Sequence, residues 1–143
     1  EFIKYIIKHM TTQQIDLVKD SWPLVLLYRK EAGKLLYNEL FTLAPETRKL
    51  FHGDIEKQEQ KMLSTITLMV AKLKKLEDLT NEVHYLAKRH VEYEAKPEHF
   101  KILEKALMHM LAEVLKTKWD LETQKAWKAA YDVIANAMIT GMT

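Results

Sequence analysis

V-H-Y-L-A-K-R-H-V-E-Y, residues 83–93, is the stretch that decides how this chain is interpreted, because it holds a histidine in an unexpected position. In a helix, Val83, Leu86 and Ala87 fall on one apolar face, and His90 falls at the end of that face, at i+7. The charged residues around it already supply the polar face. Because an imidazole buried without a partner is costly, the pattern predicts that something is bound to His90.

The composition predicts one helical domain. A length of 143 residues is typical of a single domain that can bury one substantial core. Apolar residues make up 48% and charged residues 29%, which is typical of a soluble, globular chain rather than a disordered one. Only three glycines and three prolines interrupt it, so we expect an all-α fold of long helices with few breaks.

The first nine residues are treated separately. They read E-F-I-K-Y-I-I-K-H, which is apolar but too short for a membrane anchor or a secretory signal. The chain does not begin with methionine, so Met10 is a candidate for the natural start. We interpret residues 1–9 as an N-terminal extension or as sequence left from cloning, and residues 10–143 as a single domain.

Several functional classes are disfavoured by what the sequence lacks. Without cysteine there are no disulfides, thiolate metal sites, thiol nucleophiles or covalent C-x-x-C-H attachments. The net charge is only +2 and the lysines are spread along the chain, so no nucleic-acid partner is expected. No apolar run reaches the ~18–20 residues of a spanning helix, so no membrane partner is expected either. Neither a G-x-S-x-G motif nor a Gly-rich phosphate loop is present.

Six long helices and one short helix are predicted. Thr11 and Gln14 form a capping box that predicts a helix from about residue 12, and Pro23 inside it predicts a kink or a local break. A second helix is expected to run to about residue 44. The remaining elements are a short helix over 45–51, long helices over 55–75 and 77–93, one opened by Pro97, and a last one capped by Asp120.

Two further polar residues interrupt apolar faces. Tyr37 shares the inward face of the second helix with Gly33, and a glycine there is best explained by the close crossing of another helix. A buried phenol also needs a hydrogen-bond partner. Gln58 lies on the apolar stripe of the 55–75 helix. Periodicity alone does not show whether Tyr37, Gln58 and His90 meet, and a packing tyrosine and a solvated glutamine remain alternatives.

Seven short motifs in order give the chain a family resemblance. They are S-W at 21–22, L-L-Y-N-E-L-F at 35–41, P-E-T-R-K-L-F at 45–51, Q-E-Q-K-M at 58–62, R-H-V-E-Y at 89–93, K-P-E-H-F at 96–100 and A-W-K-A-A-Y at 126–131. At these separations the sequence resembles a globin of the bacterial single-domain kind, which is similar to neuroglobin and to the haem domain of flavohaemoglobins. The match covers residues 11–138. It implies a globin fold, with the helices arranged around a haem pocket.

The resemblance also implies roles for individual residues. His90 matches the proximal histidine that ligates the iron of a non-covalently held haem b (iron protoporphyrin IX). Phe51 matches the phenylalanine that stacks on the porphyrin, and Gln58 and Tyr37 match the distal residues across the haem from His90. Apolar wall positions are matched by Met62, Leu86, Phe100 and Leu103. Lys61 and Arg89 are expected to pair with the haem propionates, although both also suit solvated helix faces.

The implied function is reversible binding of oxygen, and also of NO and CO, in a cytoplasmic protein for oxygen transport, storage or gas scavenging. Tyr37 and Gln58 can donate hydrogen bonds to the partial negative charge of bound oxygen. An alternative is a nitric oxide dioxygenase, which at this length needs an external reductase. A haem-free globin-like signalling module is a third interpretation, and the presence of His90 and Phe51 counts against it.

The sequence also departs from the family pattern. Flavohaemoglobin-like relatives place a tyrosine and a glutamate behind the proximal histidine, where this chain has Phe100 and Met142, so redox turnover should be less favoured. Glu94 and Glu104 fall where many relatives carry glycine, around the corner leading into the next long helix, so the loop geometry there is not carried over from the family. Surface positions are expected for His52, His84, His99 and His109.

Overall fold

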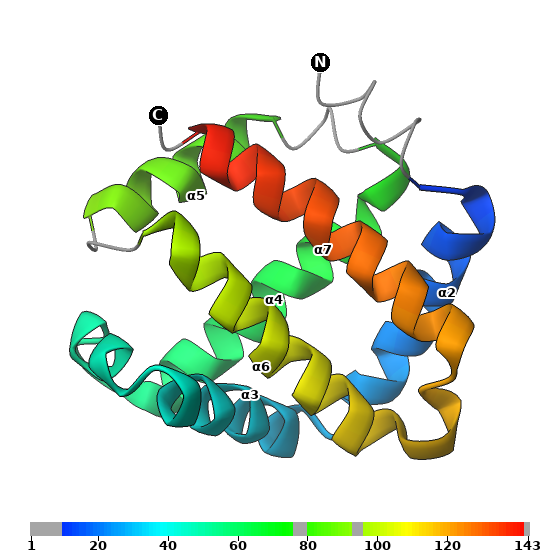
Figure 1. Cartoon of the computed structure of the whole chain (residues 1–143), viewed down its shortest axis with the longest axis horizontal. Coiled ribbons are helices and arrows are strands. Elements are labelled where there is room, and N and C mark those ends of the chain that lie inside the picture. The colour runs from blue at the N-terminus through cyan, green and yellow to red at the C-terminus, as the bar shows by residue number, and fades with distance from the viewer. Residues whose placement is uncertain (1–9, 76–79, 93–95, 142–143) are drawn as a thin grey trace.

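The computed structural model describes residues 10–75, 80–92 and 96–141, and within them the chain is helical without a strand. Figure 1 shows long helices that cross one another obliquely. Their bounds are α2 Thr12–Leu26, α3 Arg29–Leu43, α4 Ile55–Ala71, α5 Thr80–Glu92, α6 Pro97–Leu115 and α7 Leu121–Gly141, with 3-10 turns η1 Pro45–Leu50 and η3 Lys116–Lys118. The predicted order of six long helices with a short third helical segment is confirmed.

The first helix begins as predicted but ends differently. Gln14 donates its backbone N–H to the Thr11 hydroxyl at 3.1 Å, and Thr11 donates its own to the Gln14 side chain at 3.0 Å, which completes the capping box. The break predicted at Pro23 is wrong in position, because α2 continues through Pro23 and ends at Leu26. Pro23 is exposed, so the carbonyl group that loses its helical donor there can bind water instead.

Helices α3 and α4 cross closely at Gly33. A Cβ atom added to Gly33 would lie 2.9 Å from the Cβ of Glu59, a separation that side chains do not tolerate without movement. The glycine therefore lets α4 approach α3, as the sequence predicted. This crossing brings Tyr37, one turn further along α3, close to the first half of α4.

The segments around this crossing differ in detail from the prediction. The short third helix is a 3-10 turn over Pro45–Leu50, and Phe51 follows it in an extended conformation. Asp54 caps α4 by accepting the backbone N–H of Glu56 at 2.9 Å. Helix α4 ends at Ala71, four residues before the predicted end. The turn η3, where Lys116 takes a positive φ of 52°, was not predicted.

Two buried tryptophans join α2, α4 and α7. The rings of Trp22 and Trp127 lie 5.7 Å apart. Trp127 donates its indole N–H to the Ser21 hydroxyl at 2.9 Å, and Trp22 donates to the Thr67 hydroxyl at 2.9 Å. Because each buried indole N–H has a specific acceptor, these contacts fix the register of α2 against α4 and α7.

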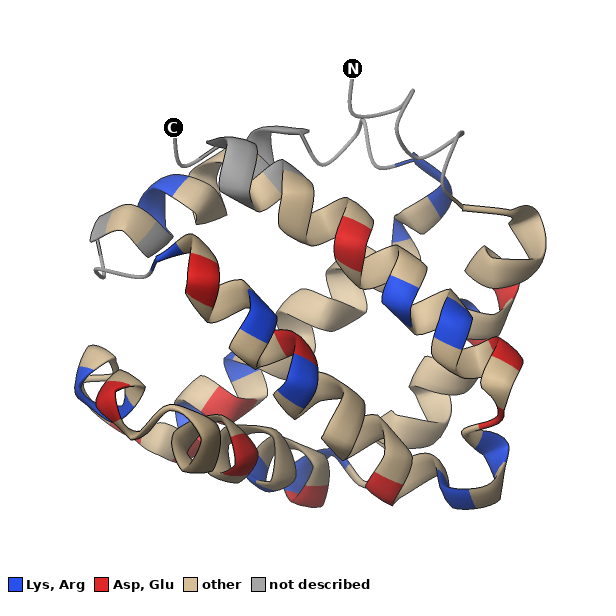
Figure 2. Cartoon of the chain, viewed as in Figure 1, with Lys and Arg blue, Asp and Glu red and all other residues tan. Residues whose placement is uncertain are grey.

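Charged residues of both signs are interspersed over the helices, as Figure 2 shows. No described helix is long and apolar enough to cross a membrane. The predicted cap of the last helix is confirmed, since the Asp120 carboxylate accepts the backbone N–H of Thr123 at 2.8 Å. That hydrogen bond also lowers the pKa of Asp120.

Candidate functional site

Tyr37 and Gln58, predicted from the sequence as polar residues on inward faces, lie together between α3 and α4. The side-chain amide nitrogen of Gln58 donates a hydrogen bond to the phenol oxygen of Tyr37 at 3.3 Å. Tyr37 is only 1% exposed, whereas Gln58 is partly buried. Burial raises the pKa of Tyr37 to about 12, so the phenol keeps its proton at neutral pH. Among the described residues, no side chain or carbonyl accepts that proton in a hydrogen bond.

Aromatic rings hold the phenol in this position. Phe51 packs edge-on against Tyr37 with ring centroids 5.4 Å apart, and Phe41 packs against both rings at 5.8 and 5.7 Å. Arg48 lies over the Phe41 ring at 5.1 Å. These contacts restrict the rotation of Tyr37. The structure thus brings together three of the residues singled out by sequence, Tyr37, Phe51 and Gln58.

Glu59 is a buried residue near this site that the sequence reasoning missed. It is 5% exposed, and its Cβ lies against Gly33 at the helix crossing. Burial raises the pKa of its carboxyl group, while the charge of Lys34 acts in the opposite direction. The spacing of Glu59 could have indicated its burial. It lies four residues after Ile55 and four before Leu63, on the same inward face of the helix.

A pocket of about 480 Å³ opens beside the Tyr37 ring, between α3, η1 and α4. Its lining includes Tyr37, Phe41, Arg48, Ile55 and Glu59. The pocket is open to solvent, so the Glu59 carboxyl group is covered by protein but within reach of water. The titratable residue Glu59 and Tyr37 therefore line the same cavity.

The four apolar wall residues come from three helices and pack against the core. Phe100 is buried at 8% exposure, whereas Met62, Leu86 and Leu103 are each partly buried. Partly buried side chains of this kind suit the walls of a site for a large apolar group. No contact that joins these four side chains to the Tyr37–Gln58 pair is described, so their role as haem contacts stays a prediction.

His90 lies on α5, but its side chain is outside the described part of the structure. Ala87, three residues before it, is fully buried, and α5 packs against α7. The helix that was predicted to carry the proximal histidine is therefore present. The ligation of iron by His90 remains a prediction.

The two predicted propionate partners differ in their surroundings. Lys61 is exposed on α4, where it lines a shallow surface hollow with Lys57 and Ser64. Arg89 is partly buried, and its guanidinium group donates a hydrogen bond to the phenol of Tyr85 at 2.7 Å. These contacts test neither role, and pairing of Lys61 and Arg89 with the haem propionates stays a prediction.

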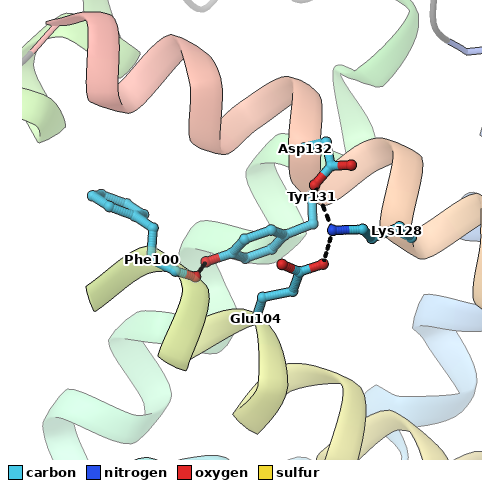
Figure 3. Close-up of polar contacts among 5 residues, drawn as sticks. All are labelled: Phe100, Glu104, Lys128, Tyr131 and Asp132. Carbon is cyan, nitrogen blue, oxygen red and sulfur yellow. Dashed lines mark hydrogen bonds and ion pairs between the residues drawn. The ribbon is translucent and has the colours of Figure 1, made fainter. Parts of the chain in front are cut away.

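Helices α6 and α7 are tied together by polar contacts next to Phe100 (Figure 3). The phenol of Tyr131 on α7 donates a hydrogen bond to the backbone carbonyl of Phe100 at 2.5 Å, while the Phe100 ring points away from that phenol. Lys128 bridges Glu104 at 2.5 Å and Asp132 at 3.1 Å. These contacts fix the first turns of α6 against α7, and those turns carry two of the predicted wall residues, Phe100 and Leu103.

Glu104 corrects one expectation drawn from the family pattern. It was placed near a loop corner, but the structure has it inside α6, two turns after Pro97, where it pairs with Lys128. A helical conformation needs no glycine there, and the ion pair explains why an acidic residue suits the position. Two of the other departures, Glu94 and Met142, lie outside the described residues.

The remaining histidines form no metal site in the described part of the chain. No group of three or more histidine, aspartate or glutamate residues there could hold a metal ion. His52 and His84 are exposed, as expected. His99 is half-buried and accepts the backbone N–H of Lys96 at 3.0 Å, and the half-buried His109 lies 3.9 Å from Glu39.

Known proteins similar to this chain share its fold along most of its length. The Globin family profile matches residues 34–138. An uncharacterized globin-like protein of Aquifex aeolicus is 32% identical over 131 residues, which cover 92% of this chain and 93% of that protein. The structure of a bacterial globin from Campylobacter jejuni matches with a TM-score of 0.83 and 26% identity, over 92% of this chain and 96% of that one. The chain belongs to the globin family, and its all-α architecture is the globin fold.

Flavohemoproteins are a second group of relatives. The flavohemoprotein of Vibrio cholerae is 25% identical over 133 residues, and that of Oceanobacillus iheyensis is 28% identical over 128 residues. The aligned regions cover 91% and 87% of this chain but only 34% and 32% of those proteins. The chain therefore corresponds to about a third of each flavohemoprotein. Membership of the globin family supports haem and gas binding in general.

Proposed function

We propose that this protein is a haem-b globin that reversibly binds oxygen, and also NO and CO, in the cytoplasm. In this proposal His90 ligates the iron, and Tyr37 with Gln58 forms the distal side of the gas site. Haem supplies the gas-binding centre, and the protein supplies an apolar pocket and directed hydrogen-bond donors. The physiological use is oxygen transport, oxygen storage or gas scavenging.

The hydrogen bond from Gln58 to Tyr37 is the observation that carries this proposal. Because the amide nitrogen donates to the phenol oxygen, the phenol O–H is free to donate elsewhere. Its raised pKa means that this proton stays in place at neutral pH. A buried, oriented O–H donor is what a diatomic ligand with partial negative charge needs for stabilisation.

The residues present fit a haem. The packing of the Phe51 ring against Tyr37 supports the proposal that Phe51 would stack on a porphyrin bound here. Met62, Leu86 and Leu103 supply partly buried apolar side chains from α4, α5 and α6. Glutamine at position 58 is a poor iron ligand, so we expect the sixth position to stay open to gas rather than to be closed by a side chain.

Repeated oxygenation tests the reversible binding directly. The reduced, haem-loaded protein should take up one oxygen per haem, release it under argon and take it up again, with the same spectrum in each cycle. Rapid conversion to the oxidised protein in the first cycle would contradict the proposal. The measurement includes a catalyst that removes peroxide, so that oxidation by side products is not mistaken for failure of the gas site.

A nitric oxide dioxygenase is the second candidate, and the flavohemoprotein relatives favour it. Here the Tyr37–Gln58 pair would hold oxygen while NO reacts with it, and a separate reductase would return the protein to its reduced form. Steady consumption of NO over many turnovers, in the presence of a flavin-dependent reductase and its reduced cofactor, supports this activity. Consumption that stops at one NO per haem under the same conditions would contradict it.

A further inference from the structure

The Glu59 carboxyl group lies where it can affect Tyr37 without contacting a gas ligand itself. It is on α4 directly after Gln58, and its side chain is covered by α3 at the crossing with Gly33. The pocket of about 480 Å³ has both Tyr37 and Glu59 in its lining. Water in this pocket can therefore reach the Glu59 carboxyl group from the side of α3 and η1.

Charged groups of both signs surround Glu59, but none of them forms an ion pair with it among the described residues. Lys34 approaches from α3 and Arg48 lines the same pocket from η1, while Asp54 and Glu56 add negative charge at the start of α4. Within the described part of the chain, none of the ion pairs involves Glu59. A covered acid without an ion pair favours its neutral form, and burial accordingly raises the pKa of this carboxyl group.

We propose that Glu59 controls the distal gas site by gaining and losing a proton through this pocket. With its proton, Glu59 carries no charge and Tyr37 donates strongly to a bound ligand. Without it, the carboxylate weakens that donation. The inference rests on the proposed function, because it requires that Tyr37 donates to the ligand.

The physical basis is the charge of the carboxylate next to the phenol. A negative charge nearby makes Tyr37 less acidic, and the Glu59 charge does raise the pKa of Tyr37. A less acidic phenol is a weaker hydrogen-bond donor, and the same charge repels the partial negative charge of bound oxygen. The exchange itself is simple: Glu59 gives its proton to water in the pocket and later takes one back, so no other reactant is needed.

The expected result is an oxygen dissociation rate that depends on pH. As the pH rises through the raised pKa of Glu59, the carboxyl group ionises and oxygen should leave faster. We expect an increase of about three- to tenfold between about pH 5 and about pH 8, from one unit charge at a partly covered position. Release should be slowest at the acid end of this range, where the protonated fraction of Glu59 is largest.

Stopped-flow measurement of oxygen replacement by CO across this pH range tests the inference in the haem-loaded protein. Glu59→Gln removes the titration and keeps the shape of the side chain, so its rate should be flat and close to the acid rate of the unmodified protein. Glu56→Gln removes the same charge from an exposed position on α4 and should keep the pH step. A flat profile in the unmodified protein, or a step that persists in Glu59→Gln, would overturn the inference.

A second measurement does not depend on gas release. Carbon-13 NMR of the side-chain carboxyl groups, in the diamagnetic ferrous CO form, should show one glutamate that titrates above the usual range and disappears in Glu59→Gln. An ordinary midpoint for that resonance would also overturn the inference. Failure of the proposed function is distinguishable, because a protein without a CO-sensitive haem spectrum fails before any rate is measured.

Discussion

The side-chain amide of Gln58 on α4 donates a hydrogen bond to the phenol oxygen of Tyr37 on α3, across 3.3 Å. This contact joins two residues that are 21 positions apart in sequence. It exists because Gly33 lets the two helices approach closely one turn earlier on α3. Because Gln58 is the donor in this hydrogen bond, the O–H group of Tyr37 can still donate to another acceptor.

Removal of the phenol hydroxyl should speed oxygen release. Tyr37→Phe keeps the ring and its packing on Phe41 and Phe51 but removes the donor. A hydrogen bond worth about 1 kcal/mol or more corresponds to a rise in the dissociation rate of about fivefold or more. Stopped-flow CO replacement measures it, and Tyr28→Phe, at an exposed position, is the matched control that should change nothing. An unchanged rate in Tyr37→Phe would remove Tyr37 from the gas site.

Tyr37 and Gln58 should act as one unit rather than as two independent donors. Gln58→Leu removes the group that orients the phenol, so part of the effect of Tyr37 should be lost with it. In a double-mutant cycle, the combined variant should therefore lose less stabilisation of bound oxygen than the sum of the two single losses. The coupling free energy should be about 0.5 kcal/mol or more. Strict additivity of the dissociation rates would show that the contact does not matter for binding.

Much of the fold was predictable because it depends on local signals. The capping box of Thr11 and Gln14 and the cap of Asp120 are fixed by neighbouring residues, and a glycine on the inward face at position 33 indicated a close helix crossing. The break near Pro23 was displaced, since proline at an exposed helix position weakens the helix without ending it. The end of α4 at Ala71 was not predictable from an apolar pattern that continues to Leu73.

The site was predictable only in part, because its residues meet through tertiary structure. Tyr37 and Gln58 were recognised as polar residues on inward faces, but their hydrogen bond depends on the angle between α3 and α4. Glu59 was missed because an acidic residue next to Gln58 is usually solvated. The Lys128 bridge to Glu104 joins two helices and leaves no local signal in either.

The contact between Ser21 and Trp127 should matter for stability rather than for gas binding. Ser21→Ala leaves the buried indole N–H without an acceptor, which costs about 1–3 kcal/mol of unfolding free energy. Urea unfolding followed by fluorescence measures this loss. Ser64→Ala, at an exposed position on α4, should change stability by less than about 0.5 kcal/mol. Equal losses of unfolding free energy in Ser21→Ala and Ser64→Ala would contradict a stabilising role for the Ser21–Trp127 hydrogen bond.

The buried phenol of Tyr37 also predicts a loss of stability in alkali. Burial raises its pKa from the usual value near 10 to about 12, so the folded state holds this proton more tightly than the unfolded state. Its contribution is fully present below about pH 10 and falls between about pH 10 and about pH 12, by about 2–3 kcal/mol in total. Urea unfolding at several alkaline pH values should show a shallower decline for Tyr37→Phe than for the unmodified protein. Parallel declines would contradict the burial of this phenol.

The most direct test of the central claim is the absorption spectrum of the purified protein, oxidised, then reduced, then reduced under CO, after haem has been supplied. The account predicts a porphyrin band that shifts sharply with CO. It also predicts that His90→Ala abolishes this band, while His84→Ala, at an exposed position on the same helix, keeps it. A protein that stays colourless with added haem, or a His90→Ala variant with an unchanged CO spectrum, would contradict the account.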